Sequence, residues 1–342
     1  MSTSLESFES EAAPLSALPI DHLLSKITKV YPPPKALDPY ILKASVDPST
    51  ITACLWATDQ DLHLISAWAS RWTGPISLLL TTTAEPSSPP HTALLRRLAA
   101  LQRHSILLNE TLSAHILHLT RPAGNSSSRN PAPANPNALL NLARLFAQTS
   151  RVALFPANMS TTPPKTLYRS LLAWSPQASS LEAVQPRLTA RRPTILTSRG
   201  QSGFPFAPLA PVVLGRDDPL WCTERFFVGP SSPEGGSAAR AADWEECLWQ
   251  IWLENFGDVE VRQTRGWLHD TFPLHSEYVP SSDPPAVTKL RRRLAAKYRS
   301  ETCVLATRQL AALRSTDKAL DAKKARWLKR VCRAWTNGAS QM

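Results

Sequence analysis

Residues 137–164 combine a helix pattern, a short apolar run and an abrupt polar stop, and this combination constrains the fold more than any other stretch. Asn135 and Pro136 supply the cap and first-turn proline of a helix whose apolar residues recur every three or four positions. Those apolar residues are Leu139, Leu142, Ala143 and Phe146. The run 152–155 is too short for a helix and predicts a buried parallel strand. Because ligands of open α/β sheets bind beyond the carboxyl ends of strands, we expect a cofactor or metal at the polar stop, 156–160.

The same alternation of strand and helix patterns continues along the chain. Strands are predicted at 51–57, 76–81, 105–108, 114–119, 194–197 and 211–214, with an edge strand at 259–261. Helices are predicted at 61–72, 92–102, 167–174 and 241–256. Strands that alternate with helices in this way are typical of an α/β fold with a mostly parallel sheet flanked by helices.

Composition divides the chain into three parts. Residues 1–48 are rich in Pro and Ser and predict an irregular leader, whereas residues 49–285 hold the α/β domain. Residues 286–342 predict a basic helical extension, because fifteen Lys and Arg stand against three acidic residues between 286 and 335. That extension accounts for the whole net charge of +11 and leaves the rest of the chain near neutral.

The basic extension is open to more than one interpretation. It can contact an anionic surface, or it can be the solvated face of a helix pair. No RNA- or DNA-binding motif accompanies it, so nucleic acid is not the partner that we expect. A phosphate-binding interaction protein, in which residues 286–335 carry the function, is one alternative reading of the chain.

Several common site types are absent from the sequence. It holds no GxGxxG, GxxxxGK[ST], HExxH or GxSxG motif, which excludes the usual Rossmann dehydrogenases, P-loop NTPases, zincins and serine hydrolases. The cysteines are odd in number, scattered and without a CxxC pair, which argues against a zinc module and against a dense disulfide framework. They are Cys54, Cys222, Cys247, Cys303 and Cys332.

Targeting signals are also missing. No apolar run approaches the roughly 20 residues of a transmembrane helix, and the N-terminus lacks the pattern of a signal peptide, so the sequence predicts a soluble chain. Acceptor sequons at Asn109, Asn125 and Asn158 matter only if the chain enters the secretory lumen.

Four segments together resemble the LARGE-type glycosyltransferases, family 49. Residues 54–80, CLWATDQDLHLISAWASRWTGPISLLL, resemble the family's first strand, helix and second strand, with its Trp and Gly-Pro-Ile-Ser. Residues 137–159 are similar to its Asn-x-x-Arg-Asn-x-Ala helix and to the strand that leads to its Asp-x-Asp. WCTERFF, 221–227, resembles its Asp-Glu-Arg-Phe segment, and 266–280 resembles its late metal-binding stretch. The segments follow one another in the family's order between about residues 50 and 300.

The resemblance implies a GT-A-like fold and an inverting transfer of a sugar from a UDP-sugar to a glycan hydroxyl. It also implies the Golgi lumen, behind a membrane anchor that this chain does not show. In the family the Asp-x-Asp holds Mn²⁺ or Mg²⁺, which neutralises the leaving diphosphate. Here Pro156 and Asn158 stand at those positions, so both negative charges are lost and Asn158 keeps one neutral oxygen ligand. Thr223 likewise replaces an Asp.

These departures leave two readings open. In the first, the enzyme works with a weakened or absent metal site, and Arg225 and the C-terminal cations hold the diphosphate through charged hydrogen bonds. In the second, the chain is a catalytically inactive GT-A-fold protein that binds a glycan or a partner. Asp217 and Asp218 are candidate replacement carboxylates, although adjacent acids before Pro219 are also typical of a capped turn.

The remaining candidates come from the two later segments. Glu224 is the candidate general base for the acceptor hydroxyl, with an ion pair to Arg225 as its structural alternative. His269 and His275 compete for the family's late metal-ligand position, and either can instead be a packed histidine. Tryptophans can stack on sugar rings, but most are expected in the core. The ones considered are Trp56, Trp221, Trp249 and Trp267.

Overall fold

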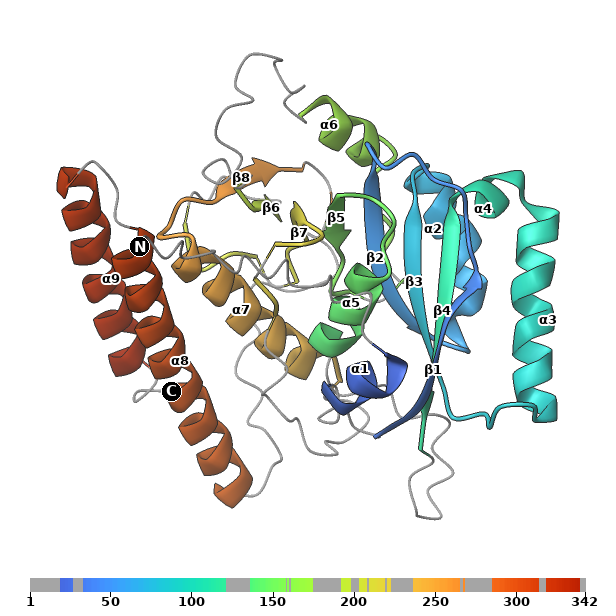
Figure 1. Cartoon of the computed structure of the whole chain (residues 1–342), viewed down its shortest axis with the longest axis horizontal. Helices are drawn as coiled ribbons and strands as arrows, with labels where there is room; N and C mark the ends of the chain where they lie inside the picture. The colour runs from blue at the N-terminus through green and yellow to red at the C-terminus, as the bar shows by residue number, and fades with distance from the viewer. Residues whose placement is uncertain are drawn as a thin grey trace, which may run out of the picture.

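An eight-stranded sheet forms the centre of the molecule (Figure 1). The structure is a computed structural model that describes residues 19–26, 33–120, 136–157, 159, 161–174, 192–197, 203–207, 209–218, 220–222, 236–264, 267, 285–313 and 318–338. The strands are β1 (Pro34–Leu42), β2 (Ile51–Thr58), β3 (Ile76–Thr82), β4 (Leu112–Leu119), β5 (Arg151–Leu154), β6 (Thr194–Thr197), β7 (Val212–Gly215) and β8 (Glu260–Gln263). Their order in the sheet is β1-β4-β3-β2-β5-β7-β6-β8.

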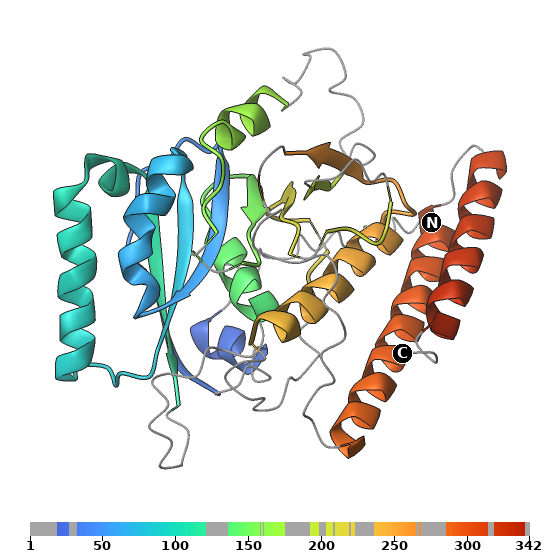
Figure 2. The same ribbon diagram turned by 180° about the vertical axis from the view of Figure 1, so that it is seen from behind.

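Helices cover both faces of this sheet (Figures 1 and 2). They are α1 (Ile20–Lys26), η2 (Asp61–Leu64), α2 (Ile65–Arg71), α3 (Pro89–His104), α4 (Ile106–Thr111), α5 (Pro136–Leu145), α6 (Leu167–Ala173), α7 (Gly236–Glu254), α8 (Pro285–Leu313) and α9 (Lys318–Gly338). Side chains of α2, α3, α4 and α6 build one core, and those of α1, α5 and α7 build the core on the other face. β2 serves both cores, because its alternate residues Leu55 and Trp56 point to opposite faces.

The sheet is mostly parallel. β2, β3, β4 and β5 pair in parallel, while β1 runs antiparallel to β4 and β7 runs antiparallel to β5 and β6. Since β8 is parallel to β6, only β1 and β7 oppose the common direction. The predicted α/β class, the mostly parallel sheet and the C-terminal helices are confirmed, and the arrangement is compatible with a GT-A-like fold.

Two segments differ from the sequence prediction. Residues 105–108 were predicted as a strand, but 106–108 belong to α4, because the Ser105 hydroxyl caps that helix by accepting a bond from the Leu108 N–H at 3.3 Å. The irregular leader predicted for 1–48 is wrong for 20–26, which form α1, and for 34–42, which form β1. Pro34 and Pro39 fit there because β1 is an edge strand, where a missing N–H costs no ladder bond.

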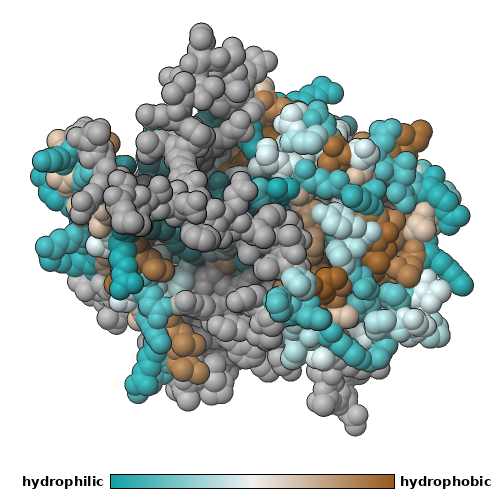
Figure 3. Space-filling view, viewed as in Figure 1, coloured by the Kyte–Doolittle hydropathy of each residue, from teal (hydrophilic) through white to brown (hydrophobic). Residues whose placement is uncertain are grey.

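The basic extension packs on α7. The Arg299 guanidinium on α8 binds both carboxylate oxygens of Glu246 on α7, and the Tyr298 hydroxyl lies 2.5 Å from Gln250 Oε1. Burial raises the pKa of Glu246, and the hydrogen bond from Arg299 opposes that rise. The remaining face of the helix pair mixes hydrophilic with hydrophobic side chains (Figure 3, left).

Four of the cysteines are joined in two disulfides. Cys222 bonds Cys247 on α7, and Cys303 on α8 bonds Cys332 on α9. Cys54 is free and buried in β2. The scattered spacing gave no sign of these pairs, since the partners meet only when the helices pack.

His115, on β4, is fully buried as a neutral imidazole. Its Nδ1 accepts a hydrogen bond from the Tyr40 N–H at 2.9 Å, and its Nε2 lies 3.2 Å from Ser77 Oγ. The Ser77 hydroxyl donates to the Ala143 carbonyl at 2.6 Å, so His115 must be the donor to Ser77. Burial lowers the pKa of His115 to about 3.

We expect the free energy of unfolding of His115→Gln to fall less steeply than that of the wild type as the pH is lowered. In the unfolded chain the imidazole gains a proton below its ordinary pKa of about 6.5, whereas in the fold it stays neutral. The neutral His115 therefore stabilises the wild type in full above about pH 6.5. Below that pH, its contribution to the free energy of unfolding falls by roughly 1 kcal/mol per pH unit. Glutamine keeps one donor and one acceptor but does not titrate. Urea unfolding between about pH 7 and pH 4 measures both slopes, and equal slopes would contradict the assignment.

Candidate functional site

The strand order reverses between β2 and β5. The chain passes from β2 to β3 and β4 on one side of the sheet, then returns through α5 to place β5 on the other side of β2. A reversal of this kind opens a crevice beyond the carboxyl ends of the two strands, where open α/β sheets bind ligands. The polar stop predicted after β5 therefore lies beside the end of β2, and we call residues 58–61 and 155–157 the switch-point site.

The β2 side of the switch-point site carries both charge signs. The Asp61 carboxylate accepts hydrogen bonds from the Thr58 hydroxyl at 2.8 Å and from the Thr58 N–H at 3.3 Å. Arg97, an exposed residue of α3, donates from its guanidinium to the Asp59 carbonyl at 3.3 Å. A guanidinium at this position has donors in reach of an anionic ligand beside the strand end.

Tryptophans hold the β5 side in place. The indole N–H of Trp56 donates to the Pro156 carbonyl, and that of Trp68 donates to the Thr161 carbonyl, each at 3.3 Å. The Phe155 ring meets Trp68 edge to face, with 5.0 Å between ring centroids. The turn after β5 is thus fixed by aromatic side chains from β2 and α2.

The late segment also begins at this edge. Trp267 is buried against Phe155, with 5.9 Å between ring centroids. Of the stretch 266–280 the structure describes this residue alone. The candidates Asn158, Glu224, Arg225, His269 and His275 all lie outside the described residues.

Asp217 and Asp218 lie at the edge of the sheet formed by the amino ends of the parallel strands, opposite the switch-point site. β7 is antiparallel to β5, and Gly215 pairs with Arg151 at the amino end of β5. β5 advances about 3.3 Å per residue, so these aspartates are some 10 Å or more from the switch-point site. The Asp218 carboxylate accepts the Gly215 N–H at 2.7 Å, and Asp217 pairs with Arg216 at 2.8 Å. The structure therefore corrects the expectation that they replace the lost carboxylates; Asp218 closes a capped turn.

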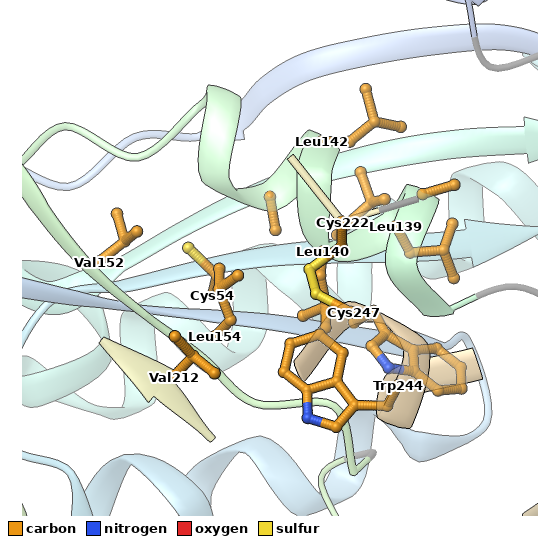
Figure 4. Packing of buried hydrophobic residues seen from close by; sticks show 14 of the residues in the cluster. Cys54, Leu139, Leu140, Leu142, Val152, Leu154, Val212, Cys222, Trp244 and Cys247 are labelled. Carbon is orange, nitrogen blue, oxygen red and sulfur yellow. A yellow bond between two sulfur atoms is a disulfide. The ribbon is translucent and has the colours of Figure 1, made fainter. Parts of the chain in front are cut away.

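A buried polar stripe on α5 holds that turn. Asn137, Asn141 and Arg144 are spaced by four and three residues, so they share one helix face. The Asn137 amide donates to the Asp243 carbonyl at 3.2 Å, and the Asn141 amide donates to the Cys222 carbonyl at 2.9 Å. The sequence predicted an amphipathic helix, yet every residue from 137 to 145 is buried. Figure 4 shows Leu139, Leu140 and Leu142 of this helix among the packed side chains.

Arg144 makes the most bonds in this stripe. Its guanidinium donates to the main-chain carbonyls of Gly215, Arg216, Asp218 and Leu220. The carbon of the same group lies 4.3 Å from the centre of the Trp221 ring. Burial lowers the pKa of Arg144 to about 10, so the group stays charged at neutral pH. The stripe and the disulfide of Cys222 together anchor the chain just before Glu224.

Most of the tryptophans considered for sugar stacking lie in the core, as the sequence predicted. Trp56, Trp249 and Trp267 are buried. Trp221 is partly buried, and the Arg144 guanidinium lies over its ring.

Sequence reasoning missed one group of residues. Among the described residues, Asp38, His91 and His118 form the one group of three or more side chains that are placed to hold a metal ion. They come from β1, α3 and β4, and no motif spacing links them, so only the register of β1 on β4 could reveal them. The described part of the switch-point site holds no such group.

Arg144→Met should destabilise the protein by about 3 kcal/mol or more, because several buried carbonyls lose their donor. Urea unfolding measures this loss, if the free energy of unfolding depends on urea concentration with the same slope in the variant and the wild type. Arg96→Met, at an exposed position on α3, is the matched control and should change stability by less than about 0.5 kcal/mol. Equal unfolding midpoints for the two variants would show that the stripe does not hold the fold.

No protein-family model matches this chain, and no curated protein matches it. The function is therefore inferred from the sheet topology and from the residues at its carboxyl edge.

Proposed function

We propose that the protein is a GT-A-like, family 49-type glycosyltransferase that binds a UDP-sugar at the switch-point site and transfers the sugar to a glycan hydroxyl. The observation that carries the proposal is the reversal of strand order between β2 and β5. It brings together parts of two segments that resemble the family, residues 58–61 within 54–80 and the end of 137–159. Trp267 adds the start of a third at the same edge.

The proposed roles follow the chemistry of an inverting transfer. Glu224 takes the proton of the acceptor hydroxyl, whose oxygen bonds the anomeric carbon as the bond to the UDP oxygen breaks. Arg225 and Arg97 are proposed to hold the diphosphate, since guanidinium groups pair with phosphate oxygens.

The residues seen here fit a metal-bound donor poorly. Pro156 offers no side-chain ligand, and its carbonyl already accepts the Trp56 indole N–H. Mn²⁺ would have to rely on Asn158 and on His269 or His275, without the two carboxylates of the family motif. The proposed reaction therefore uses cationic side chains, and no step is assigned to a metal.

The alternative is a catalytically inactive GT-A-fold protein that binds a glycan or a partner. The loss of both carboxylates at positions 156 and 158 favours it. It differs from the first proposal in that no donor nucleotide is needed.

A luminal location is part of the proposal. Disulfides persist in oxidising compartments, and the described residues contain two of them. Asn109 of the sequon Asn109-Glu110-Thr111 is exposed on α4, where a glycan has room. No helix among the described residues has both the length and the apolarity to cross a membrane.

Contact of the basic helices with an anionic surface also remains a proposal. Arg308, Lys329 and Arg333 line an open groove of about 740 Å³ between α8 and α9.

Isothermal titration with UDP and UDP-sugars, with and without Mn²⁺, tests the donor site. We expect saturable binding whose affinity changes little when Mn²⁺ is added, because cations of the chain replace the metal. Strong dependence on Mn²⁺ would contradict the cationic mechanism. Absence of binding under every condition would favour the inactive alternative.

Trp56→Phe should weaken UDP binding by up to about tenfold, because the ring remains but the donor that fixes the Pro156 carbonyl is lost. The same titration measures the change. Asp217→Asn is the matched control at the opposite edge of the sheet and should bind UDP like the wild type. If both variants bind UDP equally, the ligand does not meet the β5 turn.

Mass analysis of the protein from its native source should find sugar on Asn109, since glycosylation requires passage through the secretory lumen. Asn109→Gln should remove that mass without changing the melting temperature, because the side chain is exposed. An unmodified Asn109 in the full population would contradict the luminal proposal.

A further inference from the structure

Three side chains from separate elements meet at the edge of the sheet where β1 pairs with β4. Asp38 lies on β1, His118 near the carboxyl end of β4, and His91 in the first turn of α3. One ligand atom of each residue lies within 4.8 Å of the other two. His118 Nε2 and Asp38 Oδ2 are 2.9 Å apart.

The surroundings orient the His118 ring as a metal ligand is oriented. Its Nδ1 lies 2.9 Å from the Ala84 carbonyl, which can only accept, so Nδ1 carries a proton. Its Nε2 then faces the Asp38 carboxylate, either as a second N–H donor or through a cation that takes the place of that proton. A ring N–H bonded to a main-chain carbonyl is the usual support behind a histidine that binds metal.

His91 adds a buried polar atom to this cluster. The residue is 8% exposed, and its Nε2 has no hydrogen-bond partner among the described residues. Its Nδ1 accepts the Ser87 N–H at 3.2 Å, so both histidines turn Nδ1 toward the turn 84–87. The ring centroids of His91 and His118 are 5.1 Å apart. An orphaned buried nitrogen is costly, and a ligand beside it would remove that cost.

We propose that Asp38, His91 and His118 form a Zn²⁺ site, with both histidines bound through Nε2. Two imidazoles and one carboxylate are a common three-residue zinc set, and water completes the tetrahedron in such sites. Water can reach this one, because the Asp38 side chain is 41% exposed. Zinc also suits a chain with disulfides, since it has no redox chemistry of its own.

Two effects weaken Zn²⁺ binding at this site, and both are smaller than the affinity that we expect from the ligands. Binding through Nε2 moves the His91 ring proton to Nδ1 and breaks the bond from Ser87, which lowers affinity by roughly tenfold at most. Ser87 is exposed, so a water can accept from both the freed Ser87 N–H and the new Nδ1–H of His91. The amino end of α3 disfavours a nearby cation by about fivefold. Zinc-finger peptides, which supply four protein ligands, bind Zn²⁺ with association constants on the order of 10⁷ M⁻¹ or more. We therefore expect a site with three protein ligands to keep micromolar affinity after both effects.

The site would clamp the edge strand. The pairing of β1 with β4 becomes irregular between Asp38 and Leu42, so hydrogen bonds hold β1 less regularly beyond Asp38. Zn²⁺ would tie β1 to β4 and to α3 at this point. The cluster is separate from the switch-point site, because β3 and β4 lie between β2 and β1.

Calorimetric titration of the full chain, freed of metal by a chelator, with ZnCl₂ tests the proposal. We expect one Zn²⁺ per chain with micromolar or tighter affinity, and a higher melting temperature when zinc is present. Co²⁺ should give the intense visible absorption of a tetrahedral site. Failure to bind Zn²⁺ below about 100 μM would overturn the proposal; ordinary structural sites bind far more tightly.

Matched variants locate the ion. His91→Gln should weaken Zn²⁺ binding by at least about 100-fold while preserving the circular dichroism spectrum, since the only described polar bond of this side chain is to Ser87. His118→Gln should have the same effect. His104→Gln, at the exposed end of α3, is the control and should bind like the wild type. Equal zinc affinity in the folded His91→Gln variant and the wild type would overturn the assignment of the ligands.

Discussion

A buried guanidinium joins the two halves of the sheet. Arg144 reaches from α5, which packs over β2 and β3, to the chain that leaves β7. A buried cation without partners would be costly, but here main-chain carbonyls replace the lost hydration. Three of those carbonyls belong to the irregular segment after β7 and need donors, and the fourth is that of Gly215 at the end of the strand. The guanidinium and the carbonyls therefore satisfy each other's hydrogen bonding, and the position of the segment before Glu224 depends on these bonds.

The switch-point site rests on a second constraint, the aromatic packing around Phe155. Trp68 and Trp72 meet that ring edge to face from α2. The indole of Trp56 bonds the next residue from the other face of the sheet. Rigid aromatic side chains fix the strand end without adding charge to it, so the binding that we propose there depends on the loops that follow.

Sequence reasoning succeeded where the apolar period was long and unambiguous. β2, β3, β4 and β5 were predicted from short apolar runs, and α2, α3 and α5 from apolar residues that recur every three or four positions. It failed at 105–108, where four residues fit a strand or a helix turn and the Ser105 cap decided the outcome. It also missed β1, because prolines read as irregular unless the strand is known to lie at an edge.

The features of the candidate site also separate into those that the sequence determined and those that the tertiary structure decided. The sequence by itself determined that a polar stop without a carboxylate follows a buried strand, and that positive charge gathers in the last helices. Tertiary structure decided that Asp217 lies at the opposite edge, that Cys222 bonds Cys247, and that Asp38 meets His118. These outcomes depend on strand direction and pairing register. Both are set by contacts between residues distant in the chain, so no local pattern records them.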